Sequence, residues 1–178
     1  MSKDKFSLRS LVNDKIKMKV VGMLVIALLS IVIILIAVIL YANWNQLSAV
    51  HLKTALSQEV AKMDHLNGYE FEDYVALLLK KRHFKHIVQT NKNDDGGLDV
   101  LAEFNHVKYG FQCKHYKNRQ VDRKVLKTTA DGANYYHVQK PVIITNRYFS
   151  KHARAYQKFF RVELWDRTKL IQLIKKTL

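Results

Sequence analysis

An apolar segment near the N-terminus constrains the fold of this chain more than any other feature. Val20–Ala42 reads VVGMLVIALLSIVIILIAVILYA, and no charged residue occurs between Val20 and Val50. At about 1.5 Å per residue, a helix of this segment is about 35 Å long, which is enough to cross a bilayer core about 30 Å thick. We therefore expect residues 20–42 to form one transmembrane helix.

Two other structures produce apolar segments of this kind. A secretory signal peptide has a shorter apolar region, about 7–15 residues, and ends at a cleavage site of small residues, and no such site follows here. A helix that is apolar on every face would be difficult to bury in one small domain. The sequence therefore favours an uncleaved anchor, with Tyr41 and Trp44 at positions typical of interfacial aromatic residues.

The charges on the two sides of this segment bear on its orientation. Residues 1–19 form a basic tail with six Lys or Arg and two Asp, whereas residues 43–62 contain only Lys53 and Lys62 as charged basic residues. Because Lys and Arg resist translocation, this asymmetry favours a cytoplasmic N-terminus and a C-terminal domain outside. Good helix formers in residues 43–63 predict a helical stalk or linker before the domain.

The overall charge and the cysteine content narrow the class of protein. The 178 residues include 30 Lys or Arg and 15 Asp or Glu, so the net charge is +15, which favours nucleic acid or anionic lipid as a partner. The single cysteine, Cys113, excludes a disulfide framework and a multi-cysteine metal site. No GxxxxGK motif is present, so we expect no nucleotide cofactor.

The remainder of the chain, residues 64–178, has the periodicities of an α/β domain. We expect helices over 67–82, 121–136, 150–160 and 167–176, and strands over 84–89, 98–104, 107–114, 141–145 and 162–165. Asn67 and Glu70 have the spacing of a capping box at the start of the first helix, and Ser150 is the expected cap of the third.

Polar side chains on two neighbouring strands form the candidate catalytic group. Asp99 lies on the second expected strand, and Gln112 and Lys114 project from one face of the third. A hairpin would bring them together. Carboxylate and amide oxygens suit Mg²⁺, and a lysine can stabilise an attacking hydroxide or the charge that develops on a phosphodiester. The spacing by itself has low specificity, because a solvated strand face produces the same pattern.

Four motifs around these residues are more specific. They are GYEFE (68–72), DGGLDV (95–100), FQCKHY (111–116) and YFSKHA (148–153). Together they resemble the catalytic domain of the Mrr-type restriction endonucleases, which belong to the PD-(D/E)xK nuclease fold and use Gln where most relatives have an acid. The resemblance covers residues 64–178. It implies a restriction-endonuclease-like mixed central sheet flanked by helices, preceded in this chain by the transmembrane helix.

The resemblance also implies a site at one edge of the sheet and Mg²⁺-dependent cleavage of DNA. Carried over residue by residue, Asp99 is the main metal ligand, Gln112 the second ligand and Lys114 the catalytic lysine, while Glu72 is an acidic contributor from the first helix. Asp95 fits the motif of the family, but an Asp before two glycines is also typical of an ordinary turn.

Basic residues that follow the third strand extend the expected DNA interface. A loop and a helix N-terminus in this position can contact phosphates, and the residues are Lys117, Arg119, Arg123 and Lys124. We interpret Gly97 as a position that allows close approach of the DNA backbone. His115 stands where relatives commonly have Arg, which puts in question any phosphate contact from that position.

Two other functions remain open from the sequence. A membrane-tethered nucleic-acid-binding protein without catalysis would keep the basic surface but would not need Asp99, Gln112 and Lys114 together. A lipid-binding protein would show a basic amphipathic helix beside the span, which residues 3–19 match only loosely. For an endonuclease, a homodimer would serve double-strand cleavage. Restriction of foreign DNA would need the domain in the cytosol, opposite to the orientation that the flanking charges favour.

Overall fold

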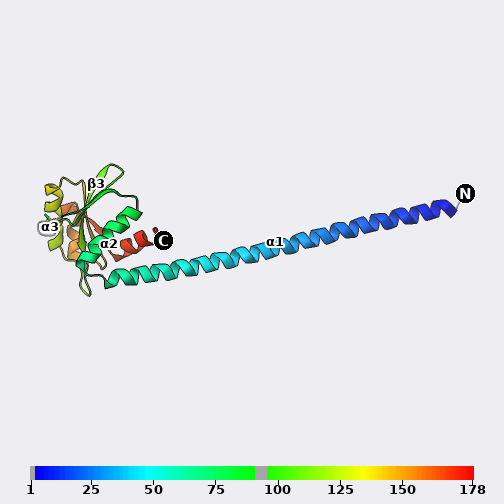
Figure 1. Ribbon diagram of the computed structural model, residues 1–178, viewed down its shortest axis with the longest axis horizontal. Helices are drawn as coiled ribbons and strands as arrows, with labels where there is room; N and C mark the ends of the chain where they lie inside the picture. Colours follow the sequence, from blue (N-terminus) through cyan, green and yellow to red (C-terminus); the bar gives the residue numbers. More distant parts are fainter. Residues whose placement is uncertain (1–2, 91–95) are drawn as a thin grey trace. The chain divides into compact units, whose positions relative to one another are not determined.

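The computed structural model describes residues 3–90 and 96–178 and divides the chain into two units, residues 1–51 and 52–178. Helix α1 (Lys3–His65) begins in the first unit and ends in the second (Figure 1). Within the first unit, the side chains of the apolar segment 20–42 are exposed. Among the described residues, α1 is the helix that is long and apolar enough to cross a membrane, a test that a signal sequence or the core helix of a soluble protein can also pass.

The last turns of α1 belong to the second unit. Met63 is fully buried in its core, and Leu56 and Val60 pack against the same core. These three residues lie at helical spacing on one face of α1. The compact unit therefore begins at Leu52, so that part of the segment expected as a stalk is packed against the domain.

A five-stranded mixed sheet forms the centre of the second unit. Its strands lie in the order β1-β2-β3-β4-β5, with antiparallel pairing among β1, β2 and β3 and parallel pairing among β3, β4 and β5. Asn105 and His106 form the turn between β2 and β3 at positive φ, as a two-residue hairpin turn requires. The expected mixed sheet is confirmed. The strands are β1 (Lys85–Gln89), β2 (Val100–Phe104), β3 (Val107–Lys114), β4 (Lys140–Thr145) and β5 (Glu163–Trp165).

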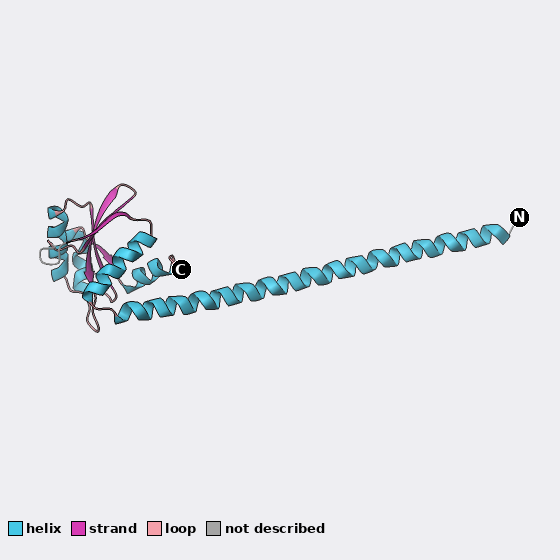
Figure 2. Ribbon diagram, viewed as in Figure 1, coloured by secondary structure: helices cyan, strands magenta, loops and turns pink. Residues whose placement is uncertain are grey.

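Helices cover both faces of this sheet (Figure 2). Helices α2 (Gly68–Lys81) and α5 (Arg167–Lys175) pack on one face, and α3 (Lys124–Tyr135) and α4 (Lys151–Phe160) pack on the other. Neighbouring residues of a strand therefore enter different cores: Ile144 packs with α2 and α5, and Ile143 packs with α3 and α4.

The local signals that begin the helices operate as the sequence predicts. In the capping box of α2, the Asn67 side chain accepts a hydrogen bond from the Glu70 backbone and the Glu70 carboxylate accepts one from the Asn67 backbone. Ser150 caps α4. Helix α3 starts at Lys124 rather than at residue 121, because Val121 is buried and forms a parallel bridge with Phe149.

Candidate active site

The hairpin of β2 and β3 places Asp99 against Gln112. Asp99 immediately precedes β2 instead of lying on it, but its backbone N–H still donates to the Phe111 carbonyl at 2.8 Å. The Asp99 Oδ2 atom accepts hydrogen bonds from the Gln112 Nε2 atom and from the Cys113 backbone N–H, both at 2.5 Å. Asp99 is 8% exposed and Gln112 is 3% exposed, so these bonds hold a buried carboxylate and a buried amide in one arrangement.

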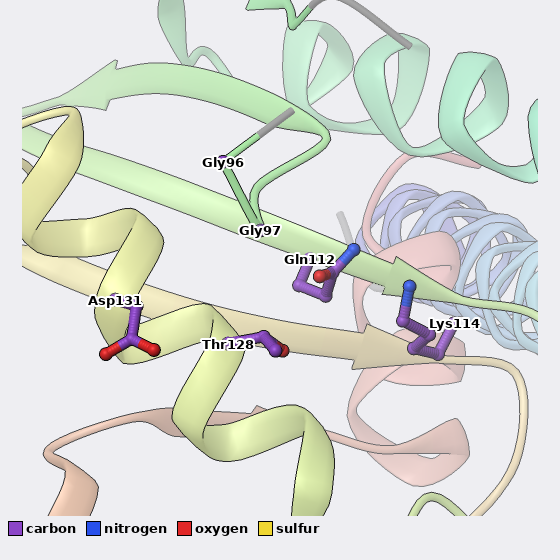
Figure 3. A pocket seen from close by; sticks show the side chains of 6 residues that line it. All are labelled: Gly96, Gly97, Gln112, Lys114, Thr128 and Asp131. Carbon is purple, nitrogen blue, oxygen red and sulfur yellow. The ribbon is translucent and has the colours of Figure 1, made fainter. Parts of the chain in front are cut away.

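Gln112 and Lys114 line a hollow of about 420 Å³ on the α3 side of the sheet (Figure 3). Gly96 and Gly97 form another part of its wall. Thr128 and Asp131 complete the lining from α3, where they lie three residues apart on one face of the helix. The sequence carries no signal that places Thr128 or Asp131 at this site, because only the packing of α3 on the sheet brings them near β3.

Glu72 approaches this end of β3 from α2, on the other face of the sheet. Its negative charge acts on the buried thiol of Cys113. Burial raises the pKa of that thiol, and the carboxylates of Asp99 and Glu72 raise it further, whereas the charge of Lys114 lowers it. Glu72 does not belong to the lining of the hollow. The charges of Asp99, Glu72 and Lys114 therefore all act on Cys113, although Glu72 comes from α2.

The donor atoms fit a hard divalent cation. Within residues 3–90 and 96–178, no group of three or more His, Cys, Asp or Glu side chains is arranged to hold a metal. Asp99 and Gln112 provide a carboxylate and an amide side by side. The Gln112 nitrogen binds Asp99, and Figure 3 shows the amide oxygen turned to the side of the hollow on which Thr128 lies. A carboxylate and an amide oxygen are ligands that suit Mg²⁺, which keeps several waters.

The glycines of this hollow have a packing role. Gly97 has a φ of 89°, and a Cβ atom there would collide with the backbone carbonyl of Thr128. Close packing against α3 therefore requires a glycine at this position, and the approach of a DNA backbone to Gly97 stays a prediction. Asp95, the other residue of interest in this loop, lies outside the described residues.

The four basic residues expected to bind DNA are all exposed: Lys117, Arg119, Arg123 and Lys124. The Arg119 guanidinium lies 4.0 Å from the ring centroid of Tyr116, and that of Arg123 lies 5.3 Å from the centroid of Tyr156. Stacking of this kind orients a planar guanidinium without using its N–H donors, which can bind a phosphate.

His115 faces the interior of the domain. Its ring packs at 5.3 Å from the ring of Phe71, and its Nε2 atom lies 3.1 Å from the Met63 carbonyl. Burial lowers the pKa of His115, although the Met63 carbonyl opposes this effect. The side chain therefore links the residue that follows β3 to the end of α1 and to α2.

A polar network beside His115 joins four segments. The buried Asn146 side chain accepts the backbone N–H of Tyr116 at 2.9 Å and donates to Asp64 at 3.3 Å, and Arg167 donates two hydrogen bonds of 2.7 Å to Asp64. Burial raises the pKa of Asp64, but the hydrogen bonds and charge of Arg167 outweigh burial, so the net pKa is lowered. This network connects the end of α1 with the segments that follow β3 and β4 and with the start of α5.

Comparison with protein families identifies the second unit. The family Mrr_cat, described as restriction endonuclease, matches residues 63–174. The chain belongs to this restriction endonuclease family. The second unit is therefore a restriction-endonuclease-like domain, a family that indicates a DNA nuclease. No curated protein matches the chain.

Solved restriction endonucleases have the same fold. The chain is 19% identical to the DNA modification-dependent restriction endonuclease AspBHI, with a TM-score of 0.52, over 70% of this chain and 35% of that one. It is 14% identical to the MspJI restriction endonuclease, solved in complex with a 27-mer oligonucleotide, with a TM-score of 0.50, over 70% of this chain and 31% of that one. The chain therefore spans about a third of the length of these two enzymes.

A third solved structure is the protein of unknown function AF1548. It is 26% identical to this chain, with a TM-score of 0.47, over 56% of this chain and 58% of that one.

Proposed function

We propose that this protein is a membrane-anchored, Mg²⁺-dependent endonuclease that hydrolyses phosphodiester bonds of DNA. The main support is the hydrogen bond between Asp99 and Gln112, which holds two oxygen-bearing side chains next to Lys114 in a domain of the restriction endonuclease family. An arrangement that only bound nucleic acid would have no need to bury a carboxylate, because a buried anion opposes the approach of phosphate.

In this proposal, Asp99 and Gln112 are the principal ligands of Mg²⁺, and Glu72 adds negative charge from α2. A bound Mg²⁺ ion supplies positive charge that stabilises the transition state of phosphodiester hydrolysis. The Lys114 ammonium lies on the same face as Gln112 and lines the hollow, where it orients the phosphate and stabilises developing negative charge.

The exposed basic residues position the DNA. Lys117 and Arg119 follow β3, which carries Gln112 and Lys114, and Arg123 and Lys124 stand at the start of α3, which carries Thr128 and Asp131. In this proposal the four residues bind the DNA backbone beside the hollow. Such contacts carry affinity without sequence information, because they are made to phosphates. A homodimer would bring two of these sites to opposite strands.

Residues 20–42 of α1 form the membrane anchor in this proposal, with the N-terminus on the cytoplasmic side as the flanking charges favour. Full-length protein should resist extraction by alkaline carbonate, and protease added to intact cells should digest the C-terminal domain. Protection of the domain would contradict this orientation, and extraction by carbonate would contradict the anchor.

Cleavage of supercoiled plasmid by the full-length protein in detergent tests the activity. The protein should nick or linearise the plasmid in Mg²⁺ and not in EDTA, and linear product without accumulated nicks indicates concerted cutting of both strands. Asp99→Asn should reduce the rate at least a hundredfold while DNA binding persists, since it removes the charge that holds the cation. Binding without cleavage by the parent protein would instead support a tethered, non-catalytic DNA-binding protein.

A further inference from the structure

A second hollow, of about 300 Å³, lies between α3 and α4. Helix α3 and the residue before it contribute three cationic side chains, and α4 contributes three aromatic ones. Among the described residues, the proposed catalytic site does not use this combination of cationic and aromatic side chains. The lining residues are Arg123, Lys124, Lys127, Tyr156, Phe159 and Phe160.

The aromatic side of this hollow is open to solvent. The Phe159 side chain is 78% exposed, and Tyr156 is 43% exposed. The neighbouring ring of Phe160 is half-buried and stands nearly perpendicular to that of Phe159, with the centroids 5.0 Å apart, so Phe160 supports Phe159 from the core side. A phenyl ring left in water costs free energy in proportion to its exposed area, so its exposure beside a hollow is typical of a binding surface.

The cations restrict the ligand to an anion. Lys127 forms an ion pair of 2.6 Å with Asp131, whereas neither Arg123 nor Lys124 forms a salt bridge within residues 3–90 and 96–178. Helix α4 contains no acidic residue. Cations beside exposed aromatic rings suit a ligand that carries negative charge next to a flat apolar group, as a nucleotide does.

The exposed ring distinguishes unpaired from paired nucleotides. Bases in a duplex are stacked on one another and do not present their faces to a protein side chain, whereas an unpaired base can stack on an aromatic ring. A volume of about 300 Å³ is at the small end of ligand pockets, which suits one nucleotide.

The position of this hollow links it to the candidate active site. Lys127 lines the hollow between α3 and α4, and its ion-pair partner Asp131 lines the hollow that contains Gln112 and Lys114. The two hollows therefore lie on neighbouring sides of α3. A single strand that crossed this helix would contact both.

We propose that the hollow between α3 and α4 binds an unpaired nucleotide of the DNA substrate, with its base stacked on Phe159 and its phosphate held by Arg123 and Lys124. This inference rests on the proposed function for its ligand and deepens it by naming single-stranded or locally unpaired DNA as the favoured substrate. The strand continues across α3 toward Lys114.

Binding in EDTA separates this inference from catalysis. The full-length protein in detergent is titrated into a fluorescent single-stranded oligonucleotide and into the matching duplex, and anisotropy is measured over a series of salt concentrations. Phe159→Ala should weaken single-strand binding about five- to a hundredfold and duplex binding less than twofold, since stacking on one base is lost. Phe159→Trp should keep or strengthen single-strand binding, and Phe159→Leu should weaken it.

The salt dependence distinguishes stacking from charge. Phe159→Ala should leave the slope of log affinity against log salt unchanged, whereas Lys124→Ala should reduce the slope by about 0.7, the value for one phosphate contact with a single strand. Leu77→Ala, which removes an exposed apolar side chain from α2, is the matched control and should change neither quantity.

Three outcomes would overturn the inference. The first is unchanged single-strand binding by Phe159→Ala. The second is equal weakening of single-strand and duplex binding. The third is a change of oligomeric state by sedimentation in Phe159→Ala, which would assign this surface to a contact between copies of the chain. The proposed function fails separately, by absence of Mg²⁺-dependent cleavage when the binding results are as expected.

Discussion

The two faces of the central sheet are built for different tasks. On the face covered by α2 and α5, residues from α1, α2, α5 and the sheet form one large apolar core that includes Phe71, Phe111 and Ile174, all fully buried. On the face covered by α3 and α4, the apolar core is smaller and is centred on Leu126 and Ile143. The hollow beside Gln112 and Lys114 and the hollow between α3 and α4 both border α3. One face thus stabilises the sheet, and the other leaves room for solvent and ligand.

The largest expected effect tests the stabilising role of the first face. Phe71→Ala should lower the free energy of unfolding by about 3–5 kcal/mol, because it leaves a cavity in the larger core. Leu126→Ala should cost about 2–5 kcal/mol and less than Phe71→Ala, because the smaller core beside the hollows can collapse more easily. Urea denaturation followed by the fluorescence of buried Trp165 measures both. A larger loss for Leu126→Ala would reverse the comparison.

The second effect tests whether catalysis belongs to the α3 face. Lys114→Ala should lower the rate of plasmid cleavage about a hundred- to a thousandfold, because it removes a charge-stabilising group, and the Mg²⁺ dependence should be unchanged. Glu72→Gln, on the α2 face, should cost about ten- to a hundredfold. Circular dichroism checks that each variant is folded. Equal losses would show that both faces contribute equally to the reaction.

A third effect concerns the network at the ends of the strands, where Asp64 pairs with Arg167. The pKa of Asp64 is lowered, so its stabilising contribution is present above its ordinary value of 3.8 and is lost as pH falls through the lower, folded value. At pH 7, Asp64→Asn should destabilise the domain by about 1.5–3 kcal/mol. The urea midpoint of the parent should exceed that of the variant at neutral pH. The two midpoints should converge below pH 4, as Asp64 of the parent becomes protonated.

The exposed pair of Lys127 and Asp131 serves as the control for this measurement. Asp131→Asn should cost about 0.5 kcal/mol at pH 7, because an exposed pair on a helix gains little from its charges. A difference between the parent and Asp64→Asn that grew toward low pH would contradict the lowered pKa of Asp64.

The smallest effect concerns the start of α2. Glu70→Gln should cost about 0.5 kcal/mol or less, because glutamine also serves in a capping box, whereas Asn67→Ala should cost about 1 kcal/mol by removing the cap itself. Thermal unfolding of the two variants measures the difference, and cleavage should stay near the parent rate. A strong loss of cleavage in Glu70→Gln would assign this residue to the reaction.

Local and short-range features of the domain could be predicted from the sequence. The capping box at Asn67 and Glu70, the two-residue turn at Asn105 and the shared face of Phe111 and Cys113 on β3 depend on residues that are neighbours in the chain, so their signals are complete within a few residues. The family motifs likewise led to the fold, which the match over residues 63–174 supports independently.

Features that depend on packing between distant segments needed the tertiary structure. The sequence does not show that Thr128 and Asp131 reach the hollow with Gln112, or that Phe159 stands exposed beside Arg123, because each requires the position of α3 relative to the sheet or to α4. The same holds for Gly97, whose neighbour is a carbonyl of α3, and for the last turns of α1. Periodicity predicts which face of an element is apolar, but only the packed fold determines what that face meets.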